Sequence, residues 1–234
     1  MADRDPHPHA RPERIGHRGA PREFDENTIE GFVRAVERGA DAVELDVHRT
    51  RDGAVVVHHD PDVRLPNGSR AAIAELMLAE VAACRLARGG SIPTLNAVFD
   101  AIGGRATIYV ELKGAGTGEP SAEIARAYGH RCAFHSFDHD AVLQLRARHP
   151  ELAYGMLLDR GTRQATAAVS RIPVRDLWPH WSLVDAEFMA AARAAEKRVI
   201  VWTVNDADLA ERLTALGVDG LCTDDVRILD RPPA

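Results

Sequence analysis

The sequence lacks the features that mark several large classes of protein. Only three of its 234 residues are cysteines, Cys84, Cys132 and Cys222, and they are far apart with no CxxC spacing. A disulfide framework or a zinc site is therefore not expected, and a reducing, cytoplasmic location is favoured. No apolar run approaches the length of a membrane-spanning helix, so we expect no integral membrane segment. The N-terminus also lacks the apolar segment of a signal peptide.

An excess of positive charge is absent as well. The 29 lysines and arginines are outnumbered by 35 aspartates and glutamates, which gives a formal net charge of −6. A surface that binds nucleic acid is usually basic, so we expect no nucleic-acid partner. Hydrophobic residues make up 45 % of the chain and charged residues 27 %, which is typical of a globular protein with a large core. The sequence leaves the oligomeric state open.

What the sequence does contain is a regular alternation of short apolar runs with amphipathic runs. This pattern predicts strands at about residues 14–17, 42–47, 54–59, 107–112, 131–136, 153–158, 175–179, 199–204 and 219–223. It predicts helices at about residues 28–38, 74–86, 121–128, 139–148, 162–170, 186–196 and 207–216. We expect residues 1–13 to form a flexible N-terminal tail and residues 14–234 to form a single domain.

The lengths of the connections select the fold. Parallel neighbours need a crossover of about a dozen residues or more, usually a helix. Only a short segment with the hairpin signal Asp52-Gly53 separates 42–47 from 54–59, so these two strands should run antiparallel. The other eight strands fit an α/β fold, the (β/α)8 TIM barrel. Residues 61–92 are expected to form a short insertion at the C-terminal face of this barrel.

Carboxylates gather near the ends of two predicted strands. Glu44 and Asp46 lie two residues apart on one strand, so their side chains share a face, and Glu111 and Lys113 stand in the same relation on the next barrel strand. In a TIM barrel the C-terminal strand ends form the active site. Three carboxylates make a site that suits one hard divalent cation, Mg²⁺ or Ca²⁺ with Mn²⁺ as a third option, better than zinc.

Cations and histidines are expected at the same mouth. His17 and Arg18 end the first strand, and the antiparallel return delivers His59. Arg18 offers a planar fork for phosphate oxygens and Lys113 a point charge, so together with a metal ion they suit an anionic phosphodiester. His17 and His59 titrate near neutral pH and can take up and release the protons that hydrolysis requires.

In this respect the sequence resembles the glycerophosphodiester phosphodiesterase family. The matching segments follow the family's order from residue 15 to residue 224: "IGHRGA" (15–20), "ENT" (26–28), "GADAVELDVHRTRDGAVVVHHD" (39–60), "IPTL" (92–95), "VELK" (110–113), "HSFD" (135–138), "VWTVN" (201–205) and "GVDGLCTD" (217–224). Two positions depart from the family's usual pattern. Asp25 stands where proline is common, which predicts a looser loop, and His58 stands where an apolar residue is common.

The resemblance implies a role for each candidate residue. It implies a divalent metal ion held by Glu44, Asp46 and Glu111. It further implies an acid–base pair, His17 and His59, substrate contacts from Arg18, Lys113 and Trp202, and a supporting role for Glu26. Four other histidines are weaker candidates: His48 and His58 as supporting or surface groups, His135 and His180 as residues that line the mouth.

The function that this set predicts is metal-dependent hydrolysis of glycerophosphodiesters to glycerol 3-phosphate and an alcohol such as choline or ethanolamine. The glycerol 2-hydroxyl can act as an internal nucleophile, which gives a route through a cyclic 1,2-phosphate; direct attack by water is the other route. Lysophospholipids or other phosphodiesters are alternative substrates, and a non-catalytic barrel that binds a phosphorylated ligand is less favoured. A metal-dependent amidohydrolase is rejected, because the only HxH motif, His7-Pro8-His9, lies in the predicted tail.

Overall fold

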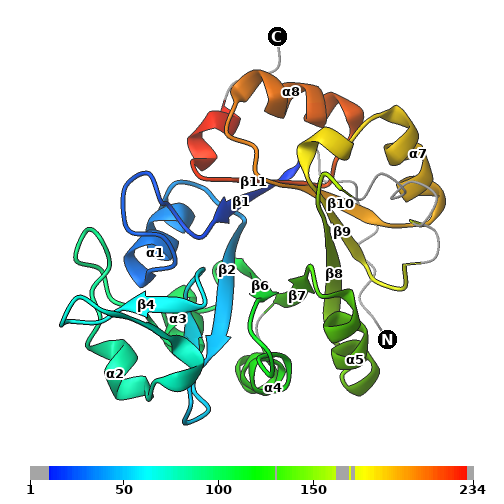
Figure 1. Ribbon diagram of the computed structural model, residues 1–234. Helices are drawn as coiled ribbons and strands as arrows, with labels where there is room; N and C mark the ends of the chain where they lie inside the picture. Colours follow the sequence, from blue (N-terminus) through cyan, green and yellow to red (C-terminus); the bar gives the residue numbers. More distant parts are fainter. Residues whose placement is uncertain (1–10, 130, 162–168, 170–171, 231–234) are drawn as a thin grey trace.

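Eight parallel strands close into a barrel in the computed structural model, which describes residues 11–129, 131–161, 169 and 172–230 (Figure 1). In their order around the barrel the strands are β1 (Glu13–His17), β2 (Ala42–Arg49), β6 (Thr107–Leu112), β7 (Cys132–Ser136), β8 (Ala153–Leu158), β9 (Asp176–Pro179), β10 (Arg198–Val201) and β11 (Gly220–Thr223). β1 pairs with both β2 and β11, which closes the ring. β3 (Val55–Val57) adds to β2 in the antiparallel sense, so the predicted barrel with one extra strand is confirmed.

Helices surround the barrel on the outside (Figure 1). They are α1 (Ile29–Glu37), α3 (Leu95–Ile102), α4 (Gly118–Tyr128), α5 (His139–Arg148), α7 (Ala186–Ala194) and α8 (Ala207–Leu216), with 3-10 turns η3 (Trp181–Leu183) and η4 (Val226–Asp230). Side-chain caps fix several helix starts: Thr28 accepts from the backbone N–H of Gly31 and Asp206 from that of Leu209. The helix predicted at 162–170 falls almost wholly outside the described residues.

The insertion differs from its prediction. It forms the hairpin β4 (Asp62–Arg64) and β5 (Arg70–Ala72), the 3-10 turn η1 (Ile73–Glu75) and the short helix α2 (Leu78–Ala82), so the single helix predicted at 74–86 is wrong. The reason is packing, because Ile73, Leu76 and Val81 join Val56 of β3 in a small core of their own. α3 was not predicted, although its buried residues Leu95, Val98, Phe99 and Ile102 follow helical spacing.

The N-terminal end of the described chain is attached to the barrel. β1 begins at Glu13, inside the segment predicted as tail, and Arg11 Nη1 lies 2.6 Å from Asp41 Oδ2. Residues 1–10, with His7 and His9, lie outside the described part, so the division into a tail and one domain stays a prediction. No helix in the described ranges is both long and apolar enough to cross a membrane.

Large aromatic side chains fill the barrel below its mouth. Trp178 of β9 and Tyr109 of β6 meet edge to face with ring centroids 5.0 Å apart. The ring of His135, on β7, stacks on Trp178 with centroids 4.3 Å apart. Stacked aromatic pairs of this kind restrict the rotation of the imidazole. His135 is thereby fixed at the upper end of the packed interior, next to the strand ends that carry the carboxylates.

Candidate active site

The acidic side chains predicted from the sequence meet at the mouth of the barrel. Glu44 and Asp46 of β2 and Glu111 of β6 are buried, with exposed fractions of 3 %, 0 % and 8 %. The parallel register sets Asp46 opposite Glu111, and His17 of β1 opposite Glu44. β7 then places His135 opposite Glu111. Four neighbouring strands therefore bring these side chains together at the same end of the barrel.

Three of these side chains form a group that can hold a metal ion. Glu44, Glu111 and His135 each offer one donor atom, and the three atoms lie within 4.8 Å of one another. The structure thus brings in His135, which the sequence suggested only as a residue lining the mouth. Asp46, the third predicted ligand, stands beside this group, and its Oδ2 accepts a 2.8 Å hydrogen bond from Asn27 Nδ2.

The electrostatics of the group fit a bound cation. Burial, followed by the charges of Asp46 and Glu44, raises the pKa of Glu111 to about 7. Burial also opposes the charge of Glu44, but the interaction with His135, whose Nε2 lies 3.7 Å from Glu44 Oε1, and the charges of His17 and Arg18 hold the pKa of Glu44 below its usual value. Asp46 Oδ1 is buried and has no hydrogen-bond partner among the described residues. A divalent ion would compensate these crowded carboxylates, and oxygen donors suit Mg²⁺, Ca²⁺ or Mn²⁺.

Two cations stand among the carboxylates. Arg18 Nε lies 3.2 Å from Asp46 Oδ2, and Arg18 Nη1 lies 3.1 Å from both carboxylate oxygens of Glu26. Lys113 Nζ lies 3.2 Å from Glu111 Oε1 and 3.6 Å from Asp46 Oδ1. Glu26 thus contacts Arg18, the predicted phosphate-binding residue, and does not belong to the donor group found among the described residues. Arg18 Nη2 makes no hydrogen bond to a described residue and is left for a ligand.

The loop between β1 and α1 bends sharply to bring Arg18 and Asn27 into the mouth. Both residues have a positive φ, 52° and 59°, which is uncommon outside glycine. Between them Gly19 has a φ of 89°, and a Cβ at this position would lie 2.7 Å from the carbonyl carbon of Gly31. A backbone held in this way persists only where its surroundings fix it.

Asp25 is one of the residues that fix this loop. Its carboxylate accepts hydrogen bonds from the backbone N–H of Arg88 at 2.9 Å and of Gly90 at 3.0 Å, both in the insertion. The side chain of Arg88 returns a 2.9 Å hydrogen bond to the carbonyl of Phe24. The looser loop predicted from the absence of proline at residue 25 is therefore wrong, because Asp25 fastens the loop to the insertion.

The two histidines predicted as the acid–base pair share one arrangement. His17 Nδ1 lies 2.7 Å from Asp224 Oδ1, and His59 Nδ1 lies 2.9 Å from Asp60 Oδ1. An ionised carboxylate only accepts hydrogen bonds, so Nδ1 carries the proton in both rings. Neither Nε2 has a hydrogen-bond partner among the described residues. The nitrogen that faces no protein partner is thus the one that can exchange a proton with a ligand.

Asp224 and Asn205 extend the arrangement behind His17. Asn205 Nδ2 donates to Asp224 Oδ2 at 2.6 Å, and Asn205 Oδ1 accepts from the backbone N–H of Asp224 at 2.9 Å. Burial lowers the pKa of His17, but the hydrogen bond to Asp224 and the charge of Glu44 outweigh it, so the net shift is upward. Sequence reasoning assigned no role to Asp224 or Asn205, although they end the quoted segments "GVDGLCTD" and "VWTVN".

The other two histidines of the 43–60 segment lie close to His59. His48 is buried, and its Nε2 donates a 3.1 Å hydrogen bond to the carbonyl of His59, which suits the supporting role predicted for it. The backbone N–H of His58 donates to the carbonyl of Asp46 at 3.0 Å. His58 therefore belongs to the edge of the mouth, with its buried Nδ1 unpartnered among the described residues.

Trp202 lies on the opposite half of the mouth, directly after β10. Its Nε1 donates a 2.8 Å hydrogen bond to the carbonyl of Trp178, which fixes the ring. Phe137 and His180 meet this ring edge to face, with centroids 5.6 Å and 5.3 Å away. Trp178 is buried in the barrel interior, and Trp202 is half-buried and packs against it, so the substrate contact predicted for Trp202 stays a prediction.

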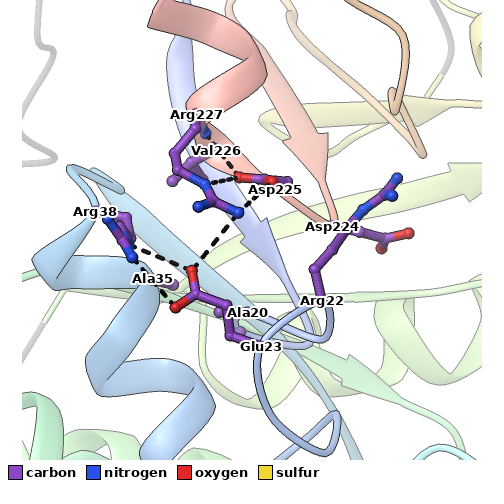
Figure 2. A pocket seen from close by; sticks show the side chains of 10 residues that line it. Ala20, Arg22, Glu23, Ala35, Arg38, Asp224, Asp225, Val226 and Arg227 are labelled. Carbon is purple, nitrogen blue, oxygen red and sulfur yellow. Dashed lines mark hydrogen bonds and ion pairs between the residues drawn. The ribbon is translucent and has the colours of Figure 1, made fainter.

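A small cavity adjoins Asp224 behind the β1–α1 loop (Figure 2). Its wall is an ion-pair cluster in which Glu23 contacts Arg38 and Arg227, and Asp225 contacts Arg227. The cavity holds about 10 Å³, which corresponds to about one water molecule. It is too small for a substrate, so the barrel mouth is the candidate active site.

Comparison with known proteins decides the family. The sequence pattern of the "Glycerophosphoryl diester phosphodiesterase family" matches residues 17–228. The chain belongs to this family. A "Glycerophosphodiester phosphodiesterase" of Caldanaerobacter subterraneus subsp. tengcongensis is 30 % identical over 230 residues, which cover 92 % of this chain and 95 % of that one. This membership makes the chain a hydrolase of the phosphodiesterase class.

Solved structures of family members share the barrel. A phosphodiesterase of Oleispira antarctica, determined in complex with the product sn-glycerol-3-phosphate, has a TM-score of 0.85 and 26 % identity, over 94 % of this chain and 96 % of that chain. A glycerophosphodiester phosphodiesterase of Thermotoga maritima has a TM-score of 0.81 and 29 % identity, over 95 % of this chain and 98 % of that one. The family's fold is thus preserved along nearly the whole described chain.

Proposed function

We propose that this chain hydrolyses glycerophosphodiesters to glycerol 3-phosphate and an alcohol, with one divalent metal ion and two histidines. One observation carries the proposal: the carboxylate group, the cations and two histidines with free Nε2 atoms converge on a single mouth. Each part answers one need of phosphodiester hydrolysis, which requires charge neutralisation, orientation of the phosphate and two proton transfers. Membership of the family supports the same activity.

Glu44 and Glu111 are the metal ligands that we propose first, because they belong to the donor group in the sequence prediction and in the structure alike. The third position has two candidates, and both can serve. His135 lies within donor distance of the pair, and Asp46 has a buried oxygen to which no described residue donates a hydrogen bond. When bound, the ion supplies electrostatic stabilisation of the negative charge on the phosphate. Mg²⁺, Ca²⁺ and Mn²⁺ all suit this donor set.

Arg18 and Lys113 are proposed to orient the phosphodiester. The Arg18 guanidinium is held by Glu26 and Asp46 through Nη1 and Nε, which leaves Nη2 for a phosphate oxygen. Lys113 Nζ adds a point charge beside Glu111. Arginine binds phosphate through directed hydrogen bonds and lysine mainly through its charge, so the two contacts are complementary.

His17 and His59 are proposed to exchange protons with the substrate through Nε2. One takes the proton of the attacking oxygen, and the other gives a proton to the alcohol oxygen as its bond to phosphorus breaks. Attack by the glycerol 2-hydroxyl gives a cyclic 1,2-phosphate, which water then opens with the histidines in exchanged roles. An internal nucleophile has a large proximity advantage over water. Asp224 and Asp60 keep the proton on Nδ1 in both rings.

The test is a product assay with a panel of glycerophosphodiesters and each of Mg²⁺, Ca²⁺ and Mn²⁺. We expect release of glycerol 3-phosphate that stops in excess chelator, and His17→Ala and His59→Ala should each lose about a hundred- to ten-thousand-fold in kcat while still binding metal. Full activity of metal-free protein would contradict the proposed requirement for a metal ion. Hydrolysis of lysophospholipids without any glycerophosphodiesterase activity identifies the alternative substrate class, and no hydrolysis with retained phosphate-ligand binding identifies a non-catalytic barrel.

We also propose a cytoplasmic location, which the free thiols of Cys84, Cys132 and Cys222 support.

A further inference from the structure

The half of the mouth opposite the carboxylates carries a cation, Arg160, to which the described residues supply no acidic partner. Arg160 follows β8 and is exposed. Its Cζ lies 5.8 Å from the ring centroid of Trp181, and its Nε and Nη2 lie 3.2 Å and 3.1 Å from His180 Nε2. Among the described residues no carboxylate forms an ion pair with this guanidinium; the neighbouring Asp159 accepts instead from the backbone N–H of Gly161 at 2.9 Å.

The guanidinium lies against the imidazole of His180. A guanidinium only donates hydrogen bonds, so its contact with Nε2 is a hydrogen bond when the ring proton is on Nδ1. His180 Nδ1 lies 2.8 Å from Ser182 Oγ, which can accept that proton, and 3.1 Å from the backbone N–H of Ser182, which donates to Nδ1 in the other tautomer. His180 is itself buried and meets Trp202 edge to face. The guanidinium of Arg160 thus contacts His180 and Trp181, while its Nη1 has no hydrogen-bond partner among the described residues.

An aromatic surface connects Arg160 with the catalytic half of the mouth. Phe137 follows His135 by two residues, and its ring is 46 % exposed. Phe137 meets Trp202 at 5.6 Å, and Trp202 meets His180, which holds Arg160. The rings of Phe137, Trp202 and His180 thus form a chain of contacts from the end of β7 to Arg160.

We propose that Phe137, Trp202 and Arg160 bind the alcohol group of the substrate and that Arg160 selects alcohols bearing a carboxylate or a phosphate over those bearing an ammonium group such as choline. The inference rests on the proposed function. Arg18 and Lys113 already face the scissile phosphate, and glycerol is uncharged. In a glycerophosphodiester only the alcohol can supply a further anion to complement the guanidinium of Arg160. Trp202 and Phe137 alone would suit choline, but the charge of Arg160 repels it.

Three synthetic probes test the inference: the esters of glycerol 3-phosphate with glycolic acid, glycolamide and choline. Glycolate and glycolamide have nearly the same size and differ by one negative charge. In each case the glycerol 2-hydroxyl attacks phosphorus, the bond to the alcohol oxygen breaks and that oxygen takes up a proton; water then opens the cyclic phosphate to give glycerol 3-phosphate. We expect kcat/KM to be about tenfold higher for the glycolate ester than for the glycolamide ester, as a hydrogen bond between charged groups allows, and lowest for the choline ester.

The variant Arg160→Gln removes the charge and keeps a hydrogen-bonding side chain. In this variant the higher kcat/KM of the glycolate ester should disappear. The kcat/KM of the glycolamide ester should stay within about twofold, and that of the choline ester should rise. Arg160→Glu should reverse the order. The matched control is Arg126→Gln, an equal change of charge at an exposed arginine of α4 that pairs with Glu151, and it should change none of the three values. Thermal unfolding checks that each variant is folded.

Two results would overturn the inference while the proposed function stands. One is equal kcat/KM for the glycolate and glycolamide esters with the unaltered chain. The other is a uniform loss on all three esters in Arg160→Gln, which would place Arg160 on the phosphate or the glycerol. If the unaltered chain hydrolyses none of the three esters, the proposed function fails and this inference fails with it.

Discussion

His17 Nδ1 lies 2.7 Å from Asp224 Oδ1, and this contact joins the first strand of the barrel to the segment after the last. Asp224 holds the ring of His17 in one tautomer and favours its protonated form. In the proposed function Asp224 acts on the substrate only through His17, so we propose it as a positioning residue. Kinetic measurements should therefore distinguish the role of His17 from that of Asp224.

We predict that Asp224→Asn lowers kcat by about ten- to a hundredfold with a much smaller change in KM. The hydrogen bond to the Asp224 carboxylate raises the pKa of His17, so its loss should move the limb of the pH–rate profile that reports His17 to lower pH. Asp225→Asn is the control, since the Asp225 carboxylate pairs with Arg227. Equal losses in both variants, with no shift of the profile, would argue for a purely structural role.

Metal should stabilise the protein through Glu111. In metal-free protein the charges of Asp46 and Glu44 oppose ionisation of Glu111, so Glu111→Gln should raise the midpoint of thermal unfolding in chelator. Added Mg²⁺ or Mn²⁺ should raise the midpoint of the unaltered chain through linkage and raise that of Glu111→Gln much less. Glu30→Gln, on the exposed face of α1, should keep the full metal effect. The same metal-induced rise in all three proteins would remove Glu111 from the site.

Arg18→Lys keeps the charge but loses the planar fork. A lysine cannot contact Asp46, Glu26 and a phosphate oxygen at once through separate nitrogens, so kcat/KM should fall by at least about tenfold. The control is Arg38→Lys on the surface near Glu23, which should leave kcat/KM unchanged. Activity of Arg18→Lys equal to that of the unaltered chain would show that only the charge matters.

Asp25 should stabilise the protein through its contacts with the insertion. Asp25→Ala removes the acceptor for the backbone N–H groups of Arg88 and Gly90, so the free energy of unfolding in urea should fall by about 1–3 kcal/mol. Asp25→Asn keeps one acceptor oxygen, so its free energy of unfolding should lie between those of the unaltered chain and Asp25→Ala. An unchanged urea midpoint in Asp25→Ala would mean that water replaces these hydrogen bonds without loss.

Asp41 should contribute to acid sensitivity. Burial raises its pKa, but hydrogen bonds from Arg11 and the backbone of Arg14, with their charges, lower it below 3.8. A carboxyl group with a lowered pKa in the folded state contributes stability above the unfolded value, about 3.9, and loses it as the pH falls through the folded value. The difference in unfolding free energy between the unaltered chain and Asp41→Asn should therefore shrink between pH 5 and pH 3. A constant difference would exclude an ionic contribution.

The barrel was predictable because its evidence is local. Asp52-Gly53 marks the hairpin, and the remaining connections are long enough for crossovers, so strand count and direction follow from the sequence. The insertion was not predictable in the same way. Ile73, Leu76 and Val81 can stand on one face of a helix, but contact with Val56 of β3 decides their conformation. Local periodicity does not contain that contact.

The site shows the same division. Glu44, Glu111, His17 and Arg18 follow from strand ends and from the family's motifs. The contacts that hold them come from distant segments: Asp25 and Arg88 are 63 residues apart, and His135 depends on the stack with Trp178. Arg160 carries no motif, and its lack of a carboxylate partner becomes visible only when the described neighbours are placed around it.

Because β1 pairs with β11, the proposed catalytic groups can be fully assembled only after β11 has been synthesised. His17 is made 207 residues before its partner Asp224. Glu44 and Glu111 can meet on neighbouring strands while the ribosome is still working, but the ring of His17 is held only when the barrel closes. Closure over so long a stretch of chain is entropically slow, so it belongs to a late folding step. A nascent chain should thus bind metal before it can turn over substrate, and the onset of activity would report barrel closure.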